Sequence, residues 1–291
     1  MRLKAELLSA VERLTEANVP SPRMNAELLL MFTLGCDRAY LYAHPERDLT
    51  SDEIARYNTV LSERSRGVPA QYITGHQEFW GMDLIVTPAV LIPRPETEHV
   101  VETVLELVHM KRPGREEHSP QTTPLRIVDV GTGSGTIALA LAKELPQAEI
   151  HATDVSLAAL KIARTNAARH QLESHIRFHH GDLLAGFQDN FFDLVVSNPP
   201  YVGESEEDQV QLEVRKFEPR NAVFAGRSGI EVIARLIPQS GTALRVGGWI
   251  VMEISGTIVE GTTSLLDRWK DIRIVKDLQG IPRVVAARKK T

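Results

Sequence analysis

Five consecutive residues that could hold a ligand, Gly131, Thr132, Gly133, Ser134 and Gly135, lie between a run rich in β-branched residues and a helical pattern. Glycines at alternate positions predict a loop whose backbone turns tightly and lets a ligand approach closely. A dinucleotide-binding fingerprint would need a further glycine at position 136, where the chain has threonine. The spacing therefore indicates a ligand loop of another type, and a plain structural turn is the alternative.

Three carboxylates accompany this loop. Asp129 precedes it by two residues, Asp154 ends the next predicted strand, and Asp182 follows the strand after that. In doubly wound sheets a carboxylate at the position of Asp154 accepts hydrogen bonds from ribose hydroxyls, and Asp182 could accept one from an adenine amino group. Asp154 and Asp182 are alternatively helix caps, Asp154 most plausibly so because Ser156 follows it. Because the carboxyl ends of parallel strands meet at one edge, we expect all three to border a single site.

A second motif, Asn198, Pro199, Pro200 and Tyr201, ends the strand predicted over 192–197. It resembles the signature of methyltransferases that act on planar nitrogens, as Asp-x-Gly-x-Gly-x-Gly resembles the first motif of S-adenosylmethionine-dependent methyltransferases. An amide nitrogen is a poor nucleophile, and acceptors on an asparagine side chain and on a rigid proline carbonyl would orient it for in-line attack. The tyrosine ring would wall the pocket. In isolation the motif is a strand-ending turn.

The elements that must position these residues fall into three parts. Apolar spacing predicts helices over the first 70 residues, including one at 51–66 that begins with a Thr50–Glu53 capping box. Two short strands around a glycine turn are predicted over 78–86, followed by a helix at 100–108 and a polar loop at 111–124. Strands then alternate with helices, which implies a mostly parallel sheet covered on both faces. The strands are expected at 125–130, 149–154, 176–180, 192–197, 248–254, 272–278 and 283–288.

Composition excludes several classes of protein. The 291 residues are 43% hydrophobic and 24% charged, as in globular proteins, and the net charge is −5. The first 75 residues carry nine basic and ten acidic side chains, so they are no basic arm for a nucleic acid. Cys36 is the only cysteine, which excludes an intramolecular disulfide, and no metal site is expected. We expect no membrane segment or signal peptide, and a cytoplasmic location.

Further motifs identify the chain as a member of the PrmC/HemK family of peptide chain release factor glutamine N5-methyltransferases. Residues 91–98 (Leu-Ile-Pro-Arg-Pro-Glu-Thr-Glu) are close to the family's Ile-Pro-Arg-Pro-Glu-Thr-Glu. The other matching segments are Gln71–Gly75, Glu218-Pro219-Arg220 with Ala225-Gly226, and Asp277-Leu278-Gln279-Gly280 with Arg283. The family often has Gly-x-x-Gln after the fifth strand, whereas this chain has Ser255 and Ile258, which puts a contact from that loop in doubt.

The resemblance implies an α/β fold, a Rossmann-like class I methyltransferase sheet that is mostly parallel with an antiparallel final strand. A small all-α domain (1–74) for substrate recognition and a β-hairpin linker (75–93) would precede the methyltransferase domain (94–291). The implied reaction transfers a methyl group from S-adenosylmethionine to the glutamine of the Gly-Gly-Gln motif in class-one peptide chain release factors. The protein is expected to be a monomer.

The resemblance also implies the roles of individual residues. The cofactor would be bound by Asp129, Gly131, Thr132, Gly133, Ser134, Gly135, Asp154, Asp182, Leu183 and Asn198. The catalytic residues would be Asn198, Pro199, Pro200 and Tyr201. The same four would bind the substrate together with Arg94 and Glu96, and Thr97 would lie beside them, although a structural role for residues 94–97 is an equal alternative.

Three other functions remain open from the residues. A nucleic-acid exocyclic-amine methyltransferase could use the same Asn-Pro-Pro-Tyr pocket, but the acidic balance argues against it. A nicotinamide-dependent oxidoreductase is opposed by the missing glycine at position 136. A non-catalytic binding module would use the sheet only to bind a ligand.

Overall fold

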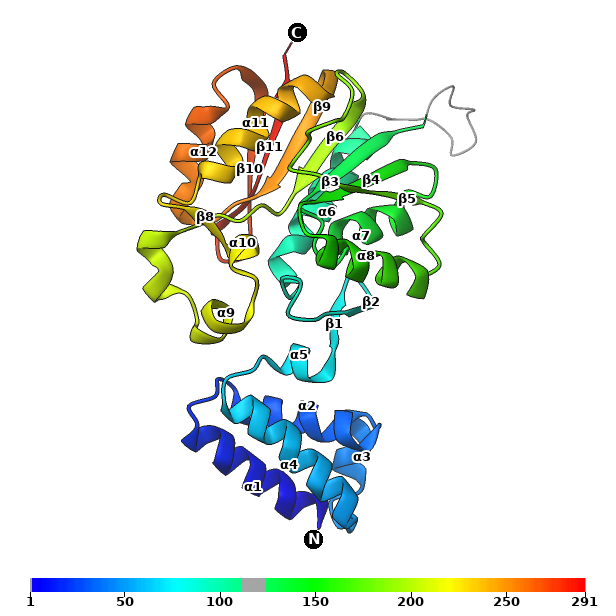
Figure 1. The fold of residues 1–291 in the computed structure, drawn as a ribbon, viewed down its shortest axis with the longest axis vertical. Coiled ribbons are helices and arrows are strands. Elements are labelled where there is room, and N and C mark those ends of the chain that lie inside the picture. The colour runs from blue at the N-terminus through cyan, green and yellow to red at the C-terminus, as the bar shows by residue number, and fades with distance from the viewer. Residues whose placement is uncertain (1, 111–123, 291) are drawn as a thin grey trace. The chain divides into compact units, whose positions relative to one another are not determined.

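The computed structural model describes residues 2–110 and 124–290 (Figure 1). The polar loop predicted at 111–124 lies, except for Pro124, outside the described residues. The chain forms two compact units, one made of residues 1–76 with 211–217 and the other of 77–210 with 218–291. We call them the helical unit and the catalytic unit. In the described part of the chain no helix is long and apolar enough to cross a membrane.

The helical unit forms around a core of leucines and one buried tyrosine, Tyr57. Its helices are α1 (Leu3–Glu16), α2 (Pro22–Leu34), α3 (Arg38–Ala43), α4 (Ser51–Ser65), α5 (Ala70–Thr74) and α9 (Leu212–Phe217). The predicted capping box is present, since the Thr50 hydroxyl accepts from the Glu53 N–H and the Glu53 carboxylate accepts from the Thr50 N–H. The short helices α3, α5 and α9 were not predicted, because five or six residues carry little periodicity.

Residues 211–217 belong to this unit through Arg64, whose side chain is almost fully buried. Its guanidinium donates to the Asn25 side-chain oxygen (2.8 Å), to the Val68 carbonyl (3.0 Å) and to the Glu213 carboxylate (2.7 Å). A buried guanidinium needs partners for its fixed fork of donors, and this arrangement supplies one from each of three segments.

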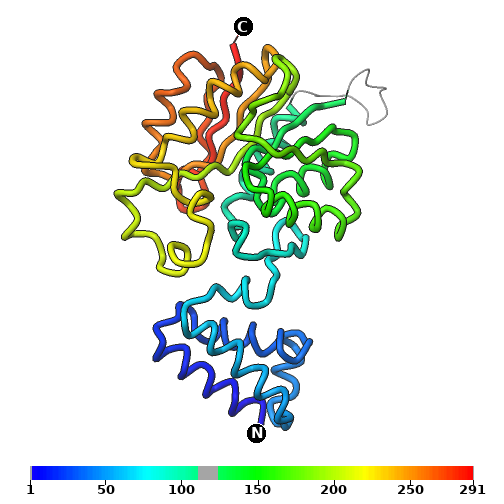
Figure 2. The backbone as a smooth tube through the Cα atoms, in the orientation of Figure 1, coloured from blue at the N-terminus to red at the C-terminus, as the bar shows by residue number. Residues whose placement is uncertain are grey.

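The catalytic unit contains a seven-stranded sheet in the order β10-β11-β9-β6-β3-β4-β5. Its strands are β3 (Arg126–Val130), β4 (Glu149–Asp154), β5 (Ile176–His180), β6 (Phe192–Ser197), β9 (Leu244–Glu253), β10 (Trp269–Lys276) and β11 (Pro282–Lys289). The first five are parallel to one another, and β11 is antiparallel to both neighbours. In Figure 2 the early strands (green) lie on one side of the sheet and the last strands (orange to red) on the other. The predicted mostly parallel sheet with an antiparallel final strand is confirmed.

The two faces of the sheet follow from alternation along each strand. Ile127, Leu194 and Val251 point into one cluster, and their neighbours Val128, Val195 and Ile250 point into the other. The first cluster is closed by α6 (Glu98–Met110), α7 (Thr136–Glu144), α8 (Leu157–Arg169) and the hairpin of β1 (His76–Phe79) and β2 (Met82–Ile85). The second is closed by α11 (Glu231–Ala243) and α12 (Val259–Leu265) (Figure 1).

The shorter elements of this unit cluster around the ends of the long strands. They are η1 (Pro95–Thr97), β7 (Val202–Gly203), η2 (Glu204–Gln209), α10 (Arg220–Val223), β8 (Phe224–Gly226) and η3 (Gly256–Ile258). The fifth strand was predicted over 248–254 but begins at Leu244, because Gly247 has φ +75° and the pairing with β6 shifts register there. A glycine pair in the sequence therefore marked an irregularity within the strand instead of its start.

Register places the predicted site residues at one edge. Val130 lies opposite Thr153 on β4 and opposite Ser197 on β6. The glycine loop, Asp154 and Asn198 are the next residues along these three strands. They therefore meet at the carboxyl ends of adjacent parallel strands, where open α/β sheets bind ligands.

Candidate active site

The glycine loop turns from β3 into α7 with three residues in the left-handed region. Gly131, Gly133 and Gly135 have φ of +72°, +56° and +89°. A Cβ atom on Gly131 or Gly133 would meet no atom within 4 Å, whereas one on Gly135 would lie 3.1 Å from a Leu139 methyl and 3.3 Å from Ala163. The first two glycines thus leave open space for a ligand, and the third allows α7 and α8 to pack closely.

The Asp129 side chain fixes this loop through hydrogen bonds. One carboxylate oxygen accepts from the Thr132 hydroxyl (2.6 Å) and from the Ala138 N–H (3.2 Å), so it joins the loop to the first turn of α7. The other oxygen is buried and has no hydrogen-bond partner among the described residues. Burial raises the pKa of Asp129 to about 7, an effect that the Thr132 and Ala138 hydrogen bonds oppose.

Asp154 fastens the loop from β4. Its side chain accepts from the Gly133 N–H (2.9 Å) and from the Ser156 N–H (2.8 Å). The cap of α8 is Ser156 itself, whose hydroxyl accepts from the Ala159 N–H. Asp154 therefore orients the glycine loop instead of capping the helix, and its half-buried carboxylate keeps lone pairs toward the cavity described below.

Asp182 and Leu183 follow β5 at the same edge. Leu183 has φ +54°, an uncommon conformation for a leucine. The Asp182 carboxylate pairs with the Arg235 guanidinium of α11, and both side chains are more than half exposed. An adenine amino group at this carboxylate would therefore share it with an arginine.

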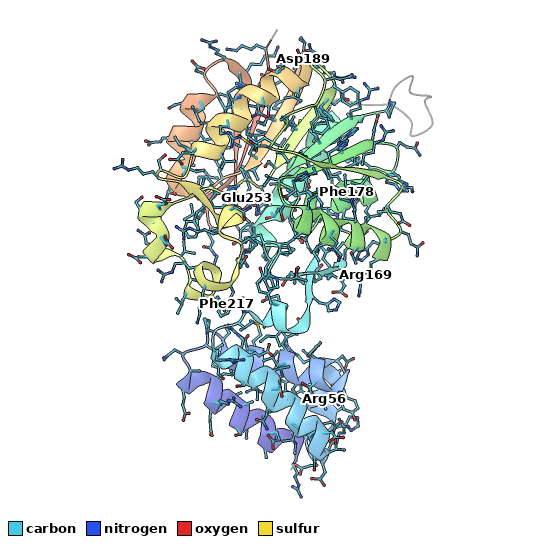
Figure 3. All side chains as sticks on the ribbon, viewed as in Figure 1. Arg56, Arg169, Phe178, Asp189, Phe217 and Glu253 are labelled. Atoms are coloured by element: carbon cyan, nitrogen blue, oxygen red, sulfur yellow. The ribbon has the colours of Figure 1, made fainter. Side chains whose placement is uncertain are left out.

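The Asn-Pro-Pro-Tyr segment leaves β6 and is held by two groups from other segments. The Asn198 side-chain amide donates to the Thr97 hydroxyl oxygen (3.0 Å), and the Tyr201 hydroxyl donates to the Glu253 carboxylate (3.0 Å). Thr97 in turn donates to the other oxygen of Glu253 (2.6 Å). Glu253, labelled in Figure 3 near the centre of the catalytic unit, ends β9 and is 2% exposed.

Burial raises the pKa of Glu253, which the hydrogen bonds from Thr97 and Tyr201 oppose. Burial also raises the pKa of the Tyr201 phenol, and the negative charge of Glu253 adds to this effect. Tyr201 is therefore a neutral hydrogen-bond donor at physiological pH and no general base.

The linker motif at 94–97 makes two connections besides the hydrogen bond from Thr97 to Glu253. Arg94 pairs with the buried carboxylate of Glu218, which also accepts from the Ile92 N–H (3.1 Å). Glu96 lies 3.6 Å from the Arg283 guanidinium, which donates to Asp277 (2.8 Å). Motif segments that are far apart in the sequence thus meet around residues 94–97.

One cavity collects most of the predicted site residues. Those that line it are Arg94, Thr97, Asp129, Gly131, Thr132, Gly133, Ser134, Asp154, Asp182, Leu183, Asn198 and Pro200. Glu96, Gly135, Pro199 and Tyr201 lie outside its lining, although each is next in sequence to a residue that lines it. The glycine loop and Asn198 therefore line the same cavity. This cavity has open space at two of the loop glycines, and the three predicted carboxylates border it.

Three residues to which the sequence analysis assigned no role support this site, although Glu218 belongs to one of the matching motifs. Glu253 and Glu218 are buried carboxylates, and Asn166 is fully buried. The Asn166 amide donates to the carbonyls of Ile85 and Ser134 and accepts from the Ile85 N–H, so it joins the hairpin to the glycine loop. A glutamate at the end of a hydrophobic strand was a usable signal for Glu253, because a buried charge needs partners; nothing in the sequence marked Asn166.

Family models match two stretches of the chain. The PrmC N-terminal domain matches residues 7–75, and the methyltransferase small domain matches residues 117–216. Among the described residues no cluster of three or more potential ligands could hold a metal ion.

Full-length relatives agree with these matches. A release factor glutamine methyltransferase of Koribacter versatilis (strain Ellin345) is 51% identical over 100% of both chains. One of Coxiella burnetii (strain RSA 493 / Nine Mile phase I) is 39% identical over 92% of each chain. Among solved structures, the hMettl16 catalytic domain in complex with MAT2A 3'UTR hairpin 6 has a TM-score of 0.56 and 17% identity, covering 86% of this chain and 92% of that one. This last likeness concerns the fold.

Proposed function

Because the chain belongs to the release factor glutamine methyltransferase family, we propose that it methylates a release factor by the chemistry its site residues allow. The methyl group of S-adenosylmethionine is transferred to the side-chain amide nitrogen of the glutamine in the Gly-Gly-Gln motif of class-one peptide chain release factors. The observation that carries this proposal is the single cavity lined by both the glycine loop and Asn198.

The residues present fit S-adenosylmethionine. Gly131 and Gly133 offer open space above a backbone turn, and the Asp154 carboxylate has lone pairs for ribose hydroxyls. The loop has no lysine, and the cofactor has no phosphate that would need one. When bound, the cofactor supplies an electrophilic methyl group on a positively charged sulfur. Asp129, the loop residues 131–135, Asp154, Asp182, Leu183 and Asn198 would hold it.

Asn198 and the Pro199 carbonyl would hold the glutamine amide. Both are hydrogen-bond acceptors, and the two N–H groups of a primary amide need two acceptors to fix its plane. Arg94 lines the same cavity, Tyr201 follows Pro200, which also lines it, and Glu96 precedes Thr97, which lines it as well. Fixed acceptors stabilise the positive charge that develops on the nitrogen as it attacks, and no strong general base is required before attack.

The remaining proposals concern the setting of this reaction. We propose that the all-α domain (1–74) recognises the release factor, that residues 75–93 form the linker and that 94–291 form the methyltransferase domain. The enzyme acts in the cytoplasm as a monomer and makes no direct contact with nucleic acid, in keeping with its net charge of −5.

The test uses the purified enzyme, labelled S-adenosylmethionine and a class-one release factor. We expect label in the wild-type factor and none after Gln→Ala in its Gly-Gly-Gln loop. Label that persists in the altered factor, or that enters RNA while the factor stays unlabelled, would overturn the proposal. The Asn198→Ala enzyme should lose about 10²-fold in kcat while it still binds the cofactor, whereas a non-catalytic binding module would be indifferent.

A further inference from the structure

Three buried or half-buried side chains form one hydrogen-bonded series in the catalytic unit. Glu253 comes from the end of β9, Thr97 from η1, and Asn198 from the residue after β6. The distances are 2.6 Å from the Thr97 hydroxyl to Glu253 and 3.0 Å from the Asn198 amide nitrogen to Thr97. Glu253 and Thr97 are each 2% exposed, so water does not replace either partner.

The donors and acceptors of this series can be assigned by counting. An ionised carboxylate only accepts, so the single proton of the Thr97 hydroxyl is directed to Glu253. The Thr97 oxygen then has only lone pairs to offer Asn198, and the asparagine must turn its NH₂ group toward it. The Asn198 side-chain oxygen therefore points away from Thr97, toward the cavity that both residues line.

We propose that Glu253 is a positioning residue that, through Thr97, fixes the Asn198 amide with its oxygen toward the substrate nitrogen. This role rests on the proposed function, because only an amide-type substrate needs an acceptor at that place. We call the series Glu253–Thr97–Asn198 the relay. The two ends of the Asn198 amide differ little in shape, so without the relay either end could face the cavity. With the NH₂ group inward, two donors would oppose the N–H groups of the glutamine amide.

Protonation of Glu253 would allow a second arrangement of the relay, in which the direction of each hydrogen bond is reversed. We call these two arrangements the two polarities of the relay. A neutral carboxyl group can donate to Thr97, which frees the threonine proton for the Asn198 oxygen and turns the amide around. The other groups that face Glu253 are the Tyr201 hydroxyl, the carboxylate of Glu96 and the guanidinium of Arg283. Burial and Glu96 raise the pKa of Glu253, whereas Arg283 and the hydrogen bonds lower it. The productive polarity is therefore lost as the pH falls through a pKa above the ordinary range of a glutamate.

The test compares Thr97→Val and Thr97→Ser with a matched Thr103→Val control. Thr103 is also buried, but its hydroxyl donates to the His99 carbonyl within α6 (2.6 Å) and to no other group of the described residues. With labelled S-adenosylmethionine and a release factor as substrate, Thr97→Val should lower kcat by about 10²-fold, since misplacement of a reacting group has effects of that size. The cofactor Kd, measured by calorimetry, should stay unchanged. Thr97→Ser keeps the hydroxyl and should retain most of the wild-type kcat.

The pH profile separates positioning from packing. In wild type and in Thr97→Ser, kcat should decrease at low pH with the same apparent pKa. Glu253→Gln should have a low kcat at every pH and should show no such decrease at low pH, because glutamine does not titrate. The relay is overturned if Thr97→Val is no slower than Thr103→Val, or if Glu253→Gln keeps the wild-type acid limb. A wild-type enzyme that leaves the glutamine unmethylated would instead overturn the proposed function, and this role with it.

Discussion

Replacing Asp129 by asparagine would show how the buried carboxyl group next to the glycine loop changes the free energy of unfolding with pH. Asp129 is 1% exposed, and burial raises its pKa from 3.8 to about 7. A raised pKa means that the folded protein binds the proton more tightly than the unfolded chain does. The stability that this group contributes is therefore complete below pH 3.8 and is lost as the pH rises toward 7.

The size of the effect follows from the width of the pH window. One pKa unit corresponds to about 1.4 kcal/mol, so the free energy of unfolding should fall by about 2 kcal/mol from this group between about pH 5.5 and pH 8. Asparagine does not titrate and cannot show this fall. Its NH₂ group would replace the oxygen that has no partner among the described residues, at a cost that does not vary with pH. The Asp129→Asn variant should therefore gain about 2 kcal/mol relative to wild type over this window.

Urea unfolding of both proteins without cofactor, at several pH values, measures this difference, because the other titrating groups are shared and cancel. A companion variant, Thr132→Val, removes a hydrogen bond that lowers the pKa of Asp129. As the pH rises, the free energy of unfolding of Thr132→Val should fall more steeply than that of wild type, whereas that of Asp129→Asn should fall less steeply. A difference between Asp129→Asn and wild type that is the same at all pH values would refute the reasoning.

Three further predictions test other parts of the structure. Gly135→Ala, with its methyl group against α7 and α8, should cost about 1–3 kcal/mol in thermal unfolding, whereas Gly133→Ala should cost less stability but weaken cofactor binding in calorimetry. Arg64→Met should cost about 3 kcal/mol and speed amide hydrogen exchange in residues 211–217, which it holds in the helical unit. Burial lowers the pKa of His151 below 6.5, so stability is lost as the pH falls below 6.5, and His151→Phe should show a smaller drop in Tm on acidification.

The parts of the fold that sequence predicted well are those governed by local periodicity. Strands β3 and β6 are rich in valine, isoleucine and leucine because both of their faces are buried, whereas β4 (Glu-Ile-His-Ala-Thr-Asp) is buried with only two apolar residues. Their carboxyl ends then had to meet at one edge, and this argument alone brought Asp154 and Asn198 to the glycine loop. The role of Asp154 needed the structure, because a carboxylate before a helix can cap it or can bind the preceding loop, and only geometry decides.

What sequence could not supply depends on long-range pairing. Residues 211–217 join the helical unit because Glu213 meets Arg64, a pair separated by 149 positions in the chain. Nothing local distinguishes that glutamate from the exposed acidic residues before it. Asn166 is a similar case, since a single asparagine in an amphipathic helix reads as a surface residue until the hairpin that it bonds is in place.

The segment 94–97 explains why the linker motif was more informative than Asn-Pro-Pro-Tyr. Arg94, Glu96 and Thr97 each contact a different part of the catalytic unit: Glu218, Arg283 and Glu253. A change at any one of them removes one interaction from its partner, and two of those partners are buried carboxylates, for which the loss of a hydrogen bond or an ion pair is costly. Asn198, by contrast, is held through Thr97 and makes sense as an acceptor only in that setting. The reactive motif alone is compatible with an ordinary turn, and the segment that fixes its polarity is what makes it specific.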